Sequence, residues 1–285
     1  MPKLAVLGQP IAHSRSPAMH TAALEEMGLA GEWSYEAIEV GPEEFEARVR
    51  ALPGEGFVGV NVTVPHKLAA LAIATDASEA ARAIGAANTL SFAGARITAE
   101  NTDATGIIQA LPRRPDDLRA LVLGAGGSAR AAVWALREAG ARVSVWNRTS
   151  SRAAELARAF EVEAIGPGEG GTLPLERFDL LLNATTVGLD GASSSPAQGI
   201  ESSPDRGLSD LKRLRVDADG LNASHVVVDL VYGTVETPLA AAARSRGAEV
   251  VDGLVVLAHQ GAASLRLWTG MEPPIETMKQ AARER

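Results

Sequence analysis

The stretch "RALVLGAGGSARAAVWAL", residues 119–136, decides the fold class of this chain. A hydrophobic run ends at Leu123, then Gly124, Gly126 and Gly127 follow, and a helical pattern begins behind them. Such glycines permit a tight turn in which backbone N–H groups approach a pyrophosphate, while the helix N-terminus adds partial positive charge. A glycine pattern alone is a weak signal, but a preceding strand and a following helix are the context that a dinucleotide site requires. The alternative is a glycine-rich turn without a ligand.

The residues after the next predicted strand, "RVSVWN", indicate which dinucleotide would bind. A site for NAD usually has Asp or Glu at this position, where it accepts a hydrogen bond from the ribose 2′-hydroxyl. This chain has no acid there and instead carries Arg148, with Arg152 one helical turn later. Because a guanidinium pairs well with a phosphate dianion, the sequence favours NADP over NAD. The alternative is that both arginines are ordinary surface residues.

Composition excludes several other classes of function. The 285 residues are 46% hydrophobic, which is enough for one large domain or two ordinary ones. A formal net charge of -8 argues against nucleic-acid or anionic-membrane partners. The chain has no cysteine and its five histidines lack metal-ligand spacing, so we expect no metal site. We see neither a signal peptide nor a bilayer-spanning stretch and therefore expect a cytoplasmic protein.

Strand and helix patterns alternate along most of the chain, which predicts an α/β protein with mostly parallel strands. The polar stretch "PRRPDDL", residues 112–118, is typical of a domain boundary, and a second α/β pattern follows it. Residues 190–220 are rich in Ser, Gly and Pro, so we expect a surface loop there.

Polar residues cluster in four segments that follow predicted strands in the first part of the chain: "GQPIAHSRSPAMH", "NVTVPHK", "GAANTL" and "NTDATG". Ligands of parallel α/β sheets bind at the carboxyl ends of the strands, so these segments can converge on one cleft. Each also has a simpler interpretation. Lys67 can be a solvated lysine at a helix start, Ser14 and Ser16 can be helix caps, and Asp103 can cap the helix that follows it.

The chain resembles the shikimate dehydrogenase family from residue 4 to about residue 270. The matching stretches occur in the family's order and at about its spacing. They are "GQPIAHSRSPAMH", "NVTVPHK", "GAANTL", "NTD", "GAGGSAR", "NRTSSR", "NAT", "DLVY" with "TPL", and "DGLVVLAHQGA". A single match of this kind is weak, but the ordered set is specific.

The resemblance implies a fold and an activity. It implies a two-domain α/β protein with an α/β substrate domain (residues 1–103 and 239–285), whose sheet is mostly parallel, and a Rossmann-type NADP-binding domain (104–238). The active site would lie in the cleft between them. The implied reaction is the reversible, NADP-dependent reduction of 3-dehydroshikimate to shikimate, a step of aromatic amino-acid biosynthesis. No metal is implied, and the protein would be a monomer or homodimer.

The resemblance also implies roles for individual residues. Lys67 and Asp103 would be the catalytic pair, with Lys67 as acid and base and Asp103 mainly orienting it. The implied substrate-binding residues are Ser14, Ser16, Thr63, Asn88, Tyr232 and Gln260. The implied cofactor-binding residues are Glu79, Gly124, Ala125, Gly126, Gly127, Ser128, Ala129, Asn147, Arg148, Thr149, Arg152, Thr185, Leu230 and Gly253. His66, next to Lys67 in the sequence, is expected to be structural.

Three other functions remain open at this point. The first is a relative that also oxidises quinate or uses NAD. The second is a non-catalytic NADP-binding regulator on the same fold, which would be expected to have lost Lys67 or Asp103. The third, a two-domain enzyme such as a methylene-tetrahydrofolate dehydrogenase, has no support from the segment that contains Ser14 and Ser16.

Overall fold

Strand β1 (Lys3–Gly8) is buried on both of its faces, since Leu4, Ala5, Val6 and Leu7 are at most 3% exposed. Consecutive buried apolar residues are typical of a strand that helices cover on both sides. In the computed structural model, which describes residues 1–189, 204–233 and 235–284, β1 lies inside a six-stranded sheet of order β2-β1-β3-β5-β6-β4. Three of its strand pairs are parallel, and β5 runs antiparallel to both of its neighbours.

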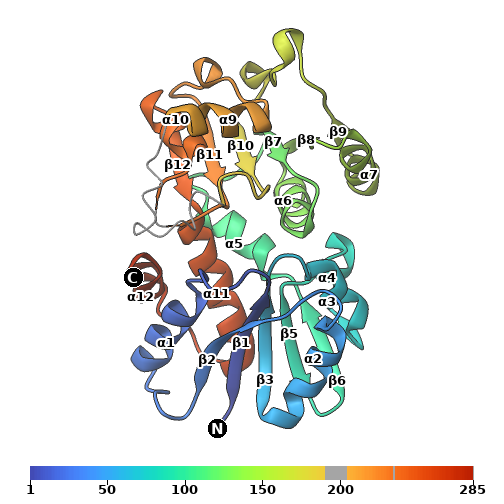
Figure 1. Cartoon of the computed structure of the whole chain (residues 1–285), viewed down its shortest axis with the longest axis vertical. Coiled ribbons are helices and arrows are strands. Elements are labelled where there is room, and N and C mark those ends of the chain that lie inside the picture. Colours follow the sequence, from blue (N-terminus) through green and yellow to red (C-terminus); the bar gives the residue numbers. More distant parts are fainter. Residues whose placement is uncertain (190–203, 234, 285) are drawn as a thin grey trace. The chain divides into compact units, whose positions relative to one another are not determined.

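This first unit comprises residues 1–109 and 254–285. Its other strands are β2 (Ser34–Glu39), β3 (Phe57–Val62), β4 (Asp76–Ala77), β5 (Thr89–Ala93) and β6 (Arg96–Glu100). Its helices are α1 (Ser16–Glu26), α2 (Phe45–Ala51), α3 (Lys67–Ile73), α4 (Glu79–Ile84), α5 (Thr102–Ala110), α11 (Gly253–Thr269) and α12 (Ile275–Arg283). The core around Leu4 and Val6 includes residues of α1, α11 and α12, and the core around Ala5 and Leu7 includes residues of α2 and α3. The two sets of helices flank the sheet in Figure 1.

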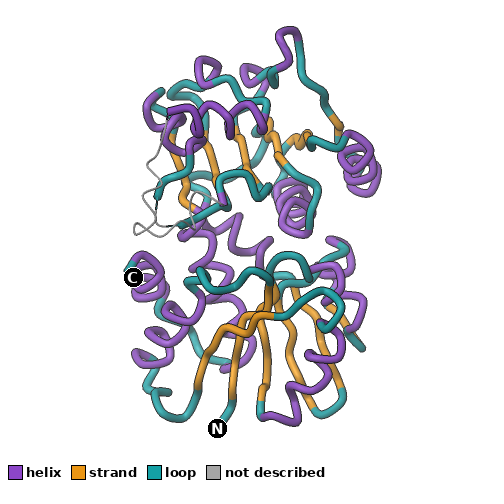
Figure 2. The backbone as a smooth tube through the Cα atoms, viewed as in Figure 1, coloured by secondary structure: helices purple, strands orange, loops and turns teal. Residues whose placement is uncertain are grey.

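The second unit comprises residues 110–253 and has a fully parallel six-stranded sheet of order β12-β11-β10-β7-β8-β9. Its strands are β7 (Arg119–Leu123), β8 (Arg142–Trp146), β9 (Glu163–Ala164), β10 (Leu180–Asn183), β11 (Val226–Asp229) and β12 (Glu249–Asp252). Its helices are α6 (Gly127–Glu138), α7 (Ser150–Phe160), α9 (Pro204–Leu214) and α10 (Pro238–Ser245). Figure 2 shows that both units contain helices and strands. The expected α/β class, with a Rossmann-type second half, is confirmed.

Two expectations differ from the structure. The expected boundary at residue 239 lies too early, because β12 pairs with β11 and keeps residues 239–252 in the second unit. The expected loop over 190–220 is wrong for two described segments, since 204–214 form α9 and 218–220 a short 3-10 helix. Leu211 and Leu214 of α9 are buried in the core, which explains why this polar stretch is helical. Residues 190–203 lie outside the described part of the chain.

Candidate functional site

Lys67 and Asp103 form an ion pair in the first unit. The Lys67 ammonium lies 2.5 Å from Oδ2 of Asp103, and their side chains are 11% and 13% exposed. Lys67 is the first residue of α3 and Asp103 lies in the first turn of α5, so two helix starts bring the pair together. Such limited exposure shields the pair from water and strengthens its attraction relative to a surface ion pair.

His66 is structural, as expected. Its side chain is 2% exposed, Nε2 lies 2.7 Å from the carbonyl oxygen of Val40, and its ring stacks on Phe45 at 4.4 Å. The histidine therefore packs into the core beneath α2, while the lysine that follows it contacts Asp103. Neighbours in the sequence thus have separate roles at this helix start.

Asn88 connects Asp103 to the interior. Its Nδ2 donates toward Oδ1 of Asp103 at 2.9 Å, toward Oε1 of Gln260 at 3.0 Å and toward Oγ1 of Thr102 at 3.0 Å. Its Oδ1 accepts from the backbone N–H of Thr102 at 2.7 Å. One side chain, 2% exposed, therefore fixes the start of α5 and orients both the carboxylate and the glutamine. Both oxygens of Asp103 have a donor, one from Asn88 and one from Lys67.

Gln260 reaches this cluster because α5 and α11 approach closely at Gly106. A Cβ at Gly106 would lie 2.7 Å from Cβ of Gln260 and 2.9 Å from the carbonyl oxygen of Val256. Only glycine leaves room for this approach. Of the residues expected to bind substrate, the structure thus brings Asn88 and Gln260 into direct contact with each other and Asn88 into contact with Asp103.

Thr63 lies next to Gly8, the residue that begins the segment containing Ser14 and Ser16. A Cβ at Gly8, the last residue of β1, would lie 2.4 Å from Cγ2 of Thr63. The loop after Gly8 leads to α1, where Ser14 Oγ accepts from the backbone N–H of Ser16 at 3.3 Å. The residue before α1 makes no side-chain cap, so neither serine is the N-cap that the simpler interpretation required. Asp103 is not a cap either, because Asn101 accepts from the N–H of Ala104.

Several polar residues behind the site were not predicted. Asn61 accepts from the hydroxyl of Tyr35 at 2.8 Å and donates to Ser264 at 3.1 Å and Thr89 at 3.2 Å. His20, fully buried, donates through Nδ1 to the carbonyl oxygen of Ser16 at 2.8 Å and stacks on Tyr35. Asn61 and His20 both lie in stretches that resemble the family, which is the signal that could have found them.

The glycine turn of the second unit has the conformation that the sequence predicted. Gly124 has φ +119°, and a Cβ there would lie 2.9 Å from the carbonyl oxygen of Ala184. Gly126 precedes α6, has no side-chain cap and has open space where a Cβ would be. A helix start with open space and no capping side chain suits a pyrophosphate.

Arg148 and Arg152 are both exposed, and no acid follows β8. Arg148 also lines a pocket of about 480 Å³, which we call the Trp146 pocket. Its lining includes Trp146, Arg148, Ile165, Pro167, Lys212 and Arg215. Asn147 donates to the carbonyl oxygen of Thr149 at 3.0 Å and thereby shapes the turn into α7.

A buried carboxylate, Asp229, organises the ends of β10 and β11. It accepts from Asn183 at 2.9 Å, from Thr237 at 2.5 Å and from the backbone N–H of Val231 at 3.1 Å. Asn183 in turn accepts from the hydroxyl of Thr185 at 2.7 Å. Burial raises the pKa of Asp229 to about 6, although these three donors oppose the shift.

The remaining residues expected to bind the cofactor are divided between the two units. Leu230 donates its N–H to the carbonyl oxygen of Asn183, and a Cβ at Gly253 would lie 2.8 Å from the carbonyl oxygen of Leu230. These two residues are therefore neighbours in the second unit. Glu79 belongs to the first unit, where it begins α4. Tyr232 follows β11 and is half-buried.

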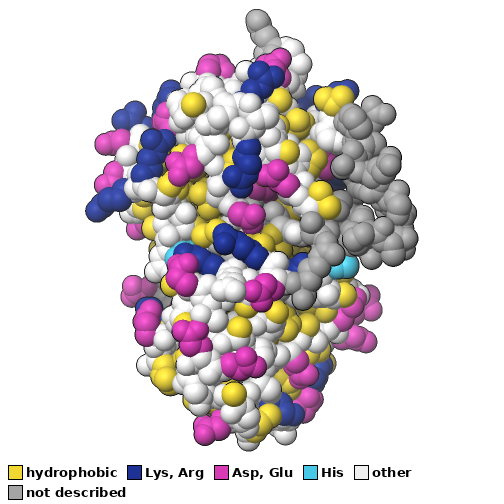
Figure 3. Space-filling view, turned by 90° about the vertical axis from the view of Figure 1, so that its left-hand side faces the viewer, with side chains coloured by type: hydrophobic (Ala, Val, Ile, Leu, Met, Phe, Trp, Pro, Cys, Tyr) yellow, Lys and Arg dark blue, Asp and Glu magenta, His cyan; other side chains and the backbone are white. Residues whose placement is uncertain are grey.

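Over residues 1–189, 204–233 and 235–284, no group of three or more His, Cys, Asp or Glu side chains is placed to hold a metal ion. No described helix is long and apolar enough to cross a bilayer. On the face in Figure 3, basic and acidic side chains are interspersed, without a continuous basic surface there.

Comparisons with known proteins point to one family. Residues 6–90 match the model of the shikimate dehydrogenase substrate binding domain, 108–188 that of shikimate / quinate 5-dehydrogenase, and 253–283 that of the shikimate 5′-dehydrogenase C-terminal domain. A shikimate dehydrogenase (NADP(+)) from Thermus thermophilus is 44% identical, over 99% of this chain and 98% of that protein. One from Methanocella arvoryzae is 40% identical, over 98% and 97%.

A solved structure gives the same result for the fold. A shikimate 5-dehydrogenase from another strain of Thermus thermophilus, in complex with NADP(H) and shikimate, is 42% identical and covers 99% of each chain, with a TM-score of 0.82. Similarity at this level over the whole length extends beyond a shared fold, since the family models match on both units. The chain belongs to the shikimate dehydrogenase family.

Proposed function

We propose that this protein catalyses the reversible, NADP-dependent reduction of 3-dehydroshikimate to shikimate, with Lys67 as the acid and base and Asp103 as its partner. The observation that carries the proposal is the ion pair of Lys67 and Asp103, which is held in place by Asn88. Family membership and NADP-dependent relatives support the reaction class. The residue roles rest on the geometry of the first unit.

Lys67 suits the proton transfer that accompanies this reaction. Oxidation of a secondary alcohol removes a hydride from carbon and a proton from the hydroxyl, and reduction returns both. When bound, NADP accepts the hydride and NADPH supplies it. In the direction of reduction, the Lys67 ammonium donates a proton to the oxygen of the developing alkoxide and stabilises its negative charge. In the opposite direction, the neutral amine accepts that proton.

Asp103 suits an orienting role. Its two oxygens accept from the Lys67 ammonium and from the amide of Asn88, so the carboxylate has fixed donors on both sides. A carboxylate with two donors is best matched to the ionised state, which is an acceptor only. The negative charge of the carboxylate attracts the Lys67 ammonium and holds it in one position. Asp103 therefore aims the ammonium and does not itself carry the proton.

The substrate contacts follow from the family resemblance; among these residues, Asn88 contacts Asp103 and Gln260 contacts Asn88. We assign the substrate carboxylate to Ser14 and Ser16, and the ring hydroxyls to Thr63, Asn88, Tyr232 and Gln260. The amide nitrogen of Asn88 has two hydrogens but three acceptors within 3.0 Å. One of these acceptors can therefore accept from a substrate hydroxyl while both amide hydrogens stay bonded. The cluster can therefore exchange an internal hydrogen bond for a bond to the ligand.

The second unit fits NADP. The N–H groups of residues 124–129 would hold the pyrophosphate, and Asn147, Arg148, Thr149 and Arg152 would hold the 2′-phosphate and its ribose. Thr185, Leu230 and Gly253 would contact the cofactor between its pyrophosphate and its nicotinamide. Glu79 is assigned to the nicotinamide end from the resemblance alone. The open position at Gly126 and the absence of an acid after β8 support this assignment. We expect a monomer or homodimer.

The test compares substrates and cofactors in one assay. We expect NADPH formation from shikimate and NADP by the purified protein, with a much lower kcat/KM for quinate and for NAD. A comparable kcat/KM for quinate would favour the broader quinate/shikimate enzyme. Tight NADP binding with no turnover of either substrate would favour the regulatory alternative, against which the intact Lys67–Asp103 pair argues.

A further inference from the structure

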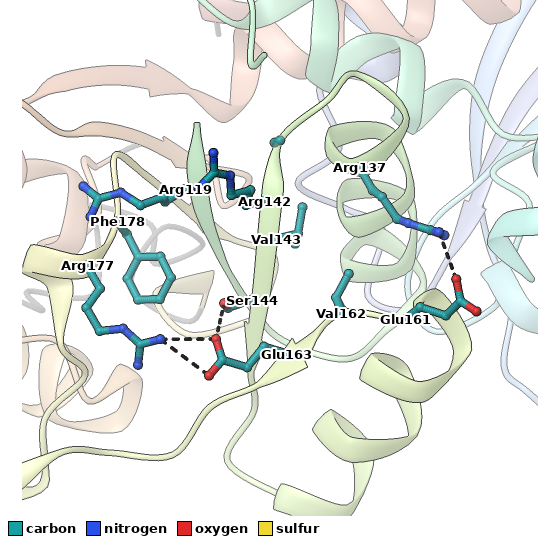
Figure 4. Close-up of a pocket in the computed structure, with 11 residues that line it drawn as sticks. Arg119, Arg137, Arg142, Val143, Ser144, Glu161, Val162, Glu163, Arg177 and Phe178 are labelled. Atoms are coloured by element: carbon teal, nitrogen blue, oxygen red, sulfur yellow. Dashed lines mark hydrogen bonds and ion pairs between the residues drawn. The ribbon is translucent and has the colours of Figure 1, made fainter. Parts of the chain in front are cut away.

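Two pockets formed by described residues of the second unit contain several arginines, and their charge balance differs. The pocket in Figure 4, of about 520 Å³, is lined by residues at the starts of β7, β8 and β9. Its arginines are paired with acids. Arg137 contacts Glu161 at 3.0 Å and Arg177 contacts Glu163 at 3.3 Å, as Figure 4 shows. Arg119 contacts Asp179 at 2.7 Å. Because these arginines are paired with acids, the pocket has little net positive charge to attract an anion.

The Trp146 pocket contrasts with it. Among the described residues, four basic ones line this pocket, Arg148, Lys212, Arg213 and Arg215, and no Asp or Glu does. Among the described residues, only Arg213 of these four forms an ion pair, with Asp210 at 3.2 Å. Arg215 donates to a carbonyl oxygen, that of Gly171, at 3.4 Å. Uncompensated positive charges that converge on one pocket repel one another, and a bound anion relieves that repulsion.

The rest of the pocket has the character of a nucleoside site. Apolar side chains of Trp146, Ile165 and Pro167 contribute to its lining, beside the basic ones. Ser150, the first residue of α7, also lines it, and no side chain caps this helix at Thr149. An apolar wall suits a flat adenine base. The helix N-terminus and the three available cations beside it suit a phosphate on the attached ribose.

We propose that Lys212 and Arg215 join Arg148 in a cationic subsite for the 2′-phosphate of NADP, with the adenine against the apolar side of the Trp146 pocket. This proposal rests on the proposed function, since it names two further residues of the same cofactor site. Arg148 lies in the stretch that resembles the family, whereas Lys212 lies on α9 and Arg215 directly behind it, outside the matched motifs. The two residues would raise specificity for NADP over NAD.

The experiment measures nucleotide binding by calorimetry on the full-length protein. The probes are 2′,5′-ADP and 5′-AMP, which differ only in the 2′-phosphate. The variants are K212Q, the double variant K212Q/R215Q, and K212R, which keeps the charge. Arg158→Gln is the matched control, because it removes an exposed arginine at the far end of α7 in the same unit.

The proposal predicts that K212Q/R215Q weakens 2′,5′-ADP binding about tenfold, since each exposed charge contributes about two- to fivefold. Binding of 5′-AMP should change less than about twofold, K212R should restore the affinity, and R158Q should have no effect. With shikimate, KM for NADP should rise while kcat stays the same. Unchanged 2′,5′-ADP binding, or an equal loss for both nucleotides, would overturn the proposal. Absence of shikimate turnover would instead count against the proposed function, since the binding assay needs no catalysis.

Discussion

The amide nitrogen of Asn88 lies 2.9 Å from Oδ1 of Asp103, while the Lys67 ammonium lies 2.5 Å from Oδ2 of the same carboxylate. Asp103 is therefore fixed from two sides, by the first residue of α3 and by the residue that precedes β5. The orientation of Lys67 depends on this carboxylate, and the orientation of the carboxylate depends on Asn88. Catalysis by Lys67 should consequently be sensitive to residues that do not touch the transferred proton.

Replacing Asp103 with Asn should lower kcat and not only raise KM. The neutral amide can occupy the same space, but it does not attract the Lys67 ammonium as a carboxylate does. We expect a loss of about tenfold to a hundredfold in kcat, within the range of a positioned acid–base group. Steady-state rates of D103N, with the exposed Glu32→Gln as the charge control, measure this. A near wild-type kcat with a raised KM would assign Asp103 to substrate binding alone.

Adding a methyl group at Gly106 should separate α5 from α11. The new Cβ would lie 2.8 Å from the backbone nitrogen of Gln260, and neither helix can yield without moving the glutamine. Overpacking of this kind costs about 1–3 kcal/mol. Thermal unfolding of G106A should show the loss, and KM for shikimate should rise. The control is Gly54→Ala, where a Cβ meets open space, and an equal effect there would refute the packing argument.

Asp229 should make the protein less stable as pH rises from about 4 to about 6. Its pKa is raised from 3.8 to about 6, mainly by burial, so the folded state favours the neutral acid. That contribution is fully present below the unfolded pKa and is lost as pH rises through the folded one. Asn cannot titrate, so D229N lacks this pH dependence. As pH rises from about 4 to about 6, the unfolding free energy of wild type should therefore fall relative to that of D229N. A constant difference, like that expected for the exposed Glu155→Gln, would contradict this.

His20 should have the opposite dependence. Burial lowers its pKa from 6.5 to about 4, although its contact with the Ser16 carbonyl opposes the shift. The stability that comes from keeping the ring neutral is present above the unfolded pKa and is lost as pH falls toward about 4. Unfolding measured between pH 6.5 and 4 should therefore be steeper in pH for wild type than for H20Q. The exposed His13→Gln should leave the slope unchanged, and the same change in both variants would count against His20.

Local patterns predicted the parts of this molecule that depend on nearby residues. The glycine turn at Gly124 and the helix start at Lys67 follow from residues within a few positions, and both were expected. The β4 and β9 strands, two residues each, were not, because so short a stretch has no periodicity to detect. Helix α9 carries Gly207 and mostly polar residues, so its sequence resembled the Ser-, Gly- and Pro-rich stretch before it.

Contacts between distant segments could not be predicted in the same way. Asn61 and Ser264 are hydrogen-bonded although 203 positions separate them, and neither spacing nor propensity indicates that contact. The end of the second unit at residue 253 could not be predicted either, because the pairing of β12 with β11 decides it. The candidate site residues were proposed from resemblance to a family, which carries this long-range information, whereas Asp229 and its partners required the structure.

The central claim is that Lys67 transfers the proton, and kcat of Lys67→Met with shikimate and NADP tests it most directly. Methionine keeps the length of the side chain and removes its charge, and Lys279→Met on α12 is the matched control. We predict that K67M loses about a hundredfold to ten-thousandfold in kcat while still binding NADP, and that K279M keeps its rate. A K67M variant that retains wild-type kcat would contradict the assignment of Lys67 as the acid and base.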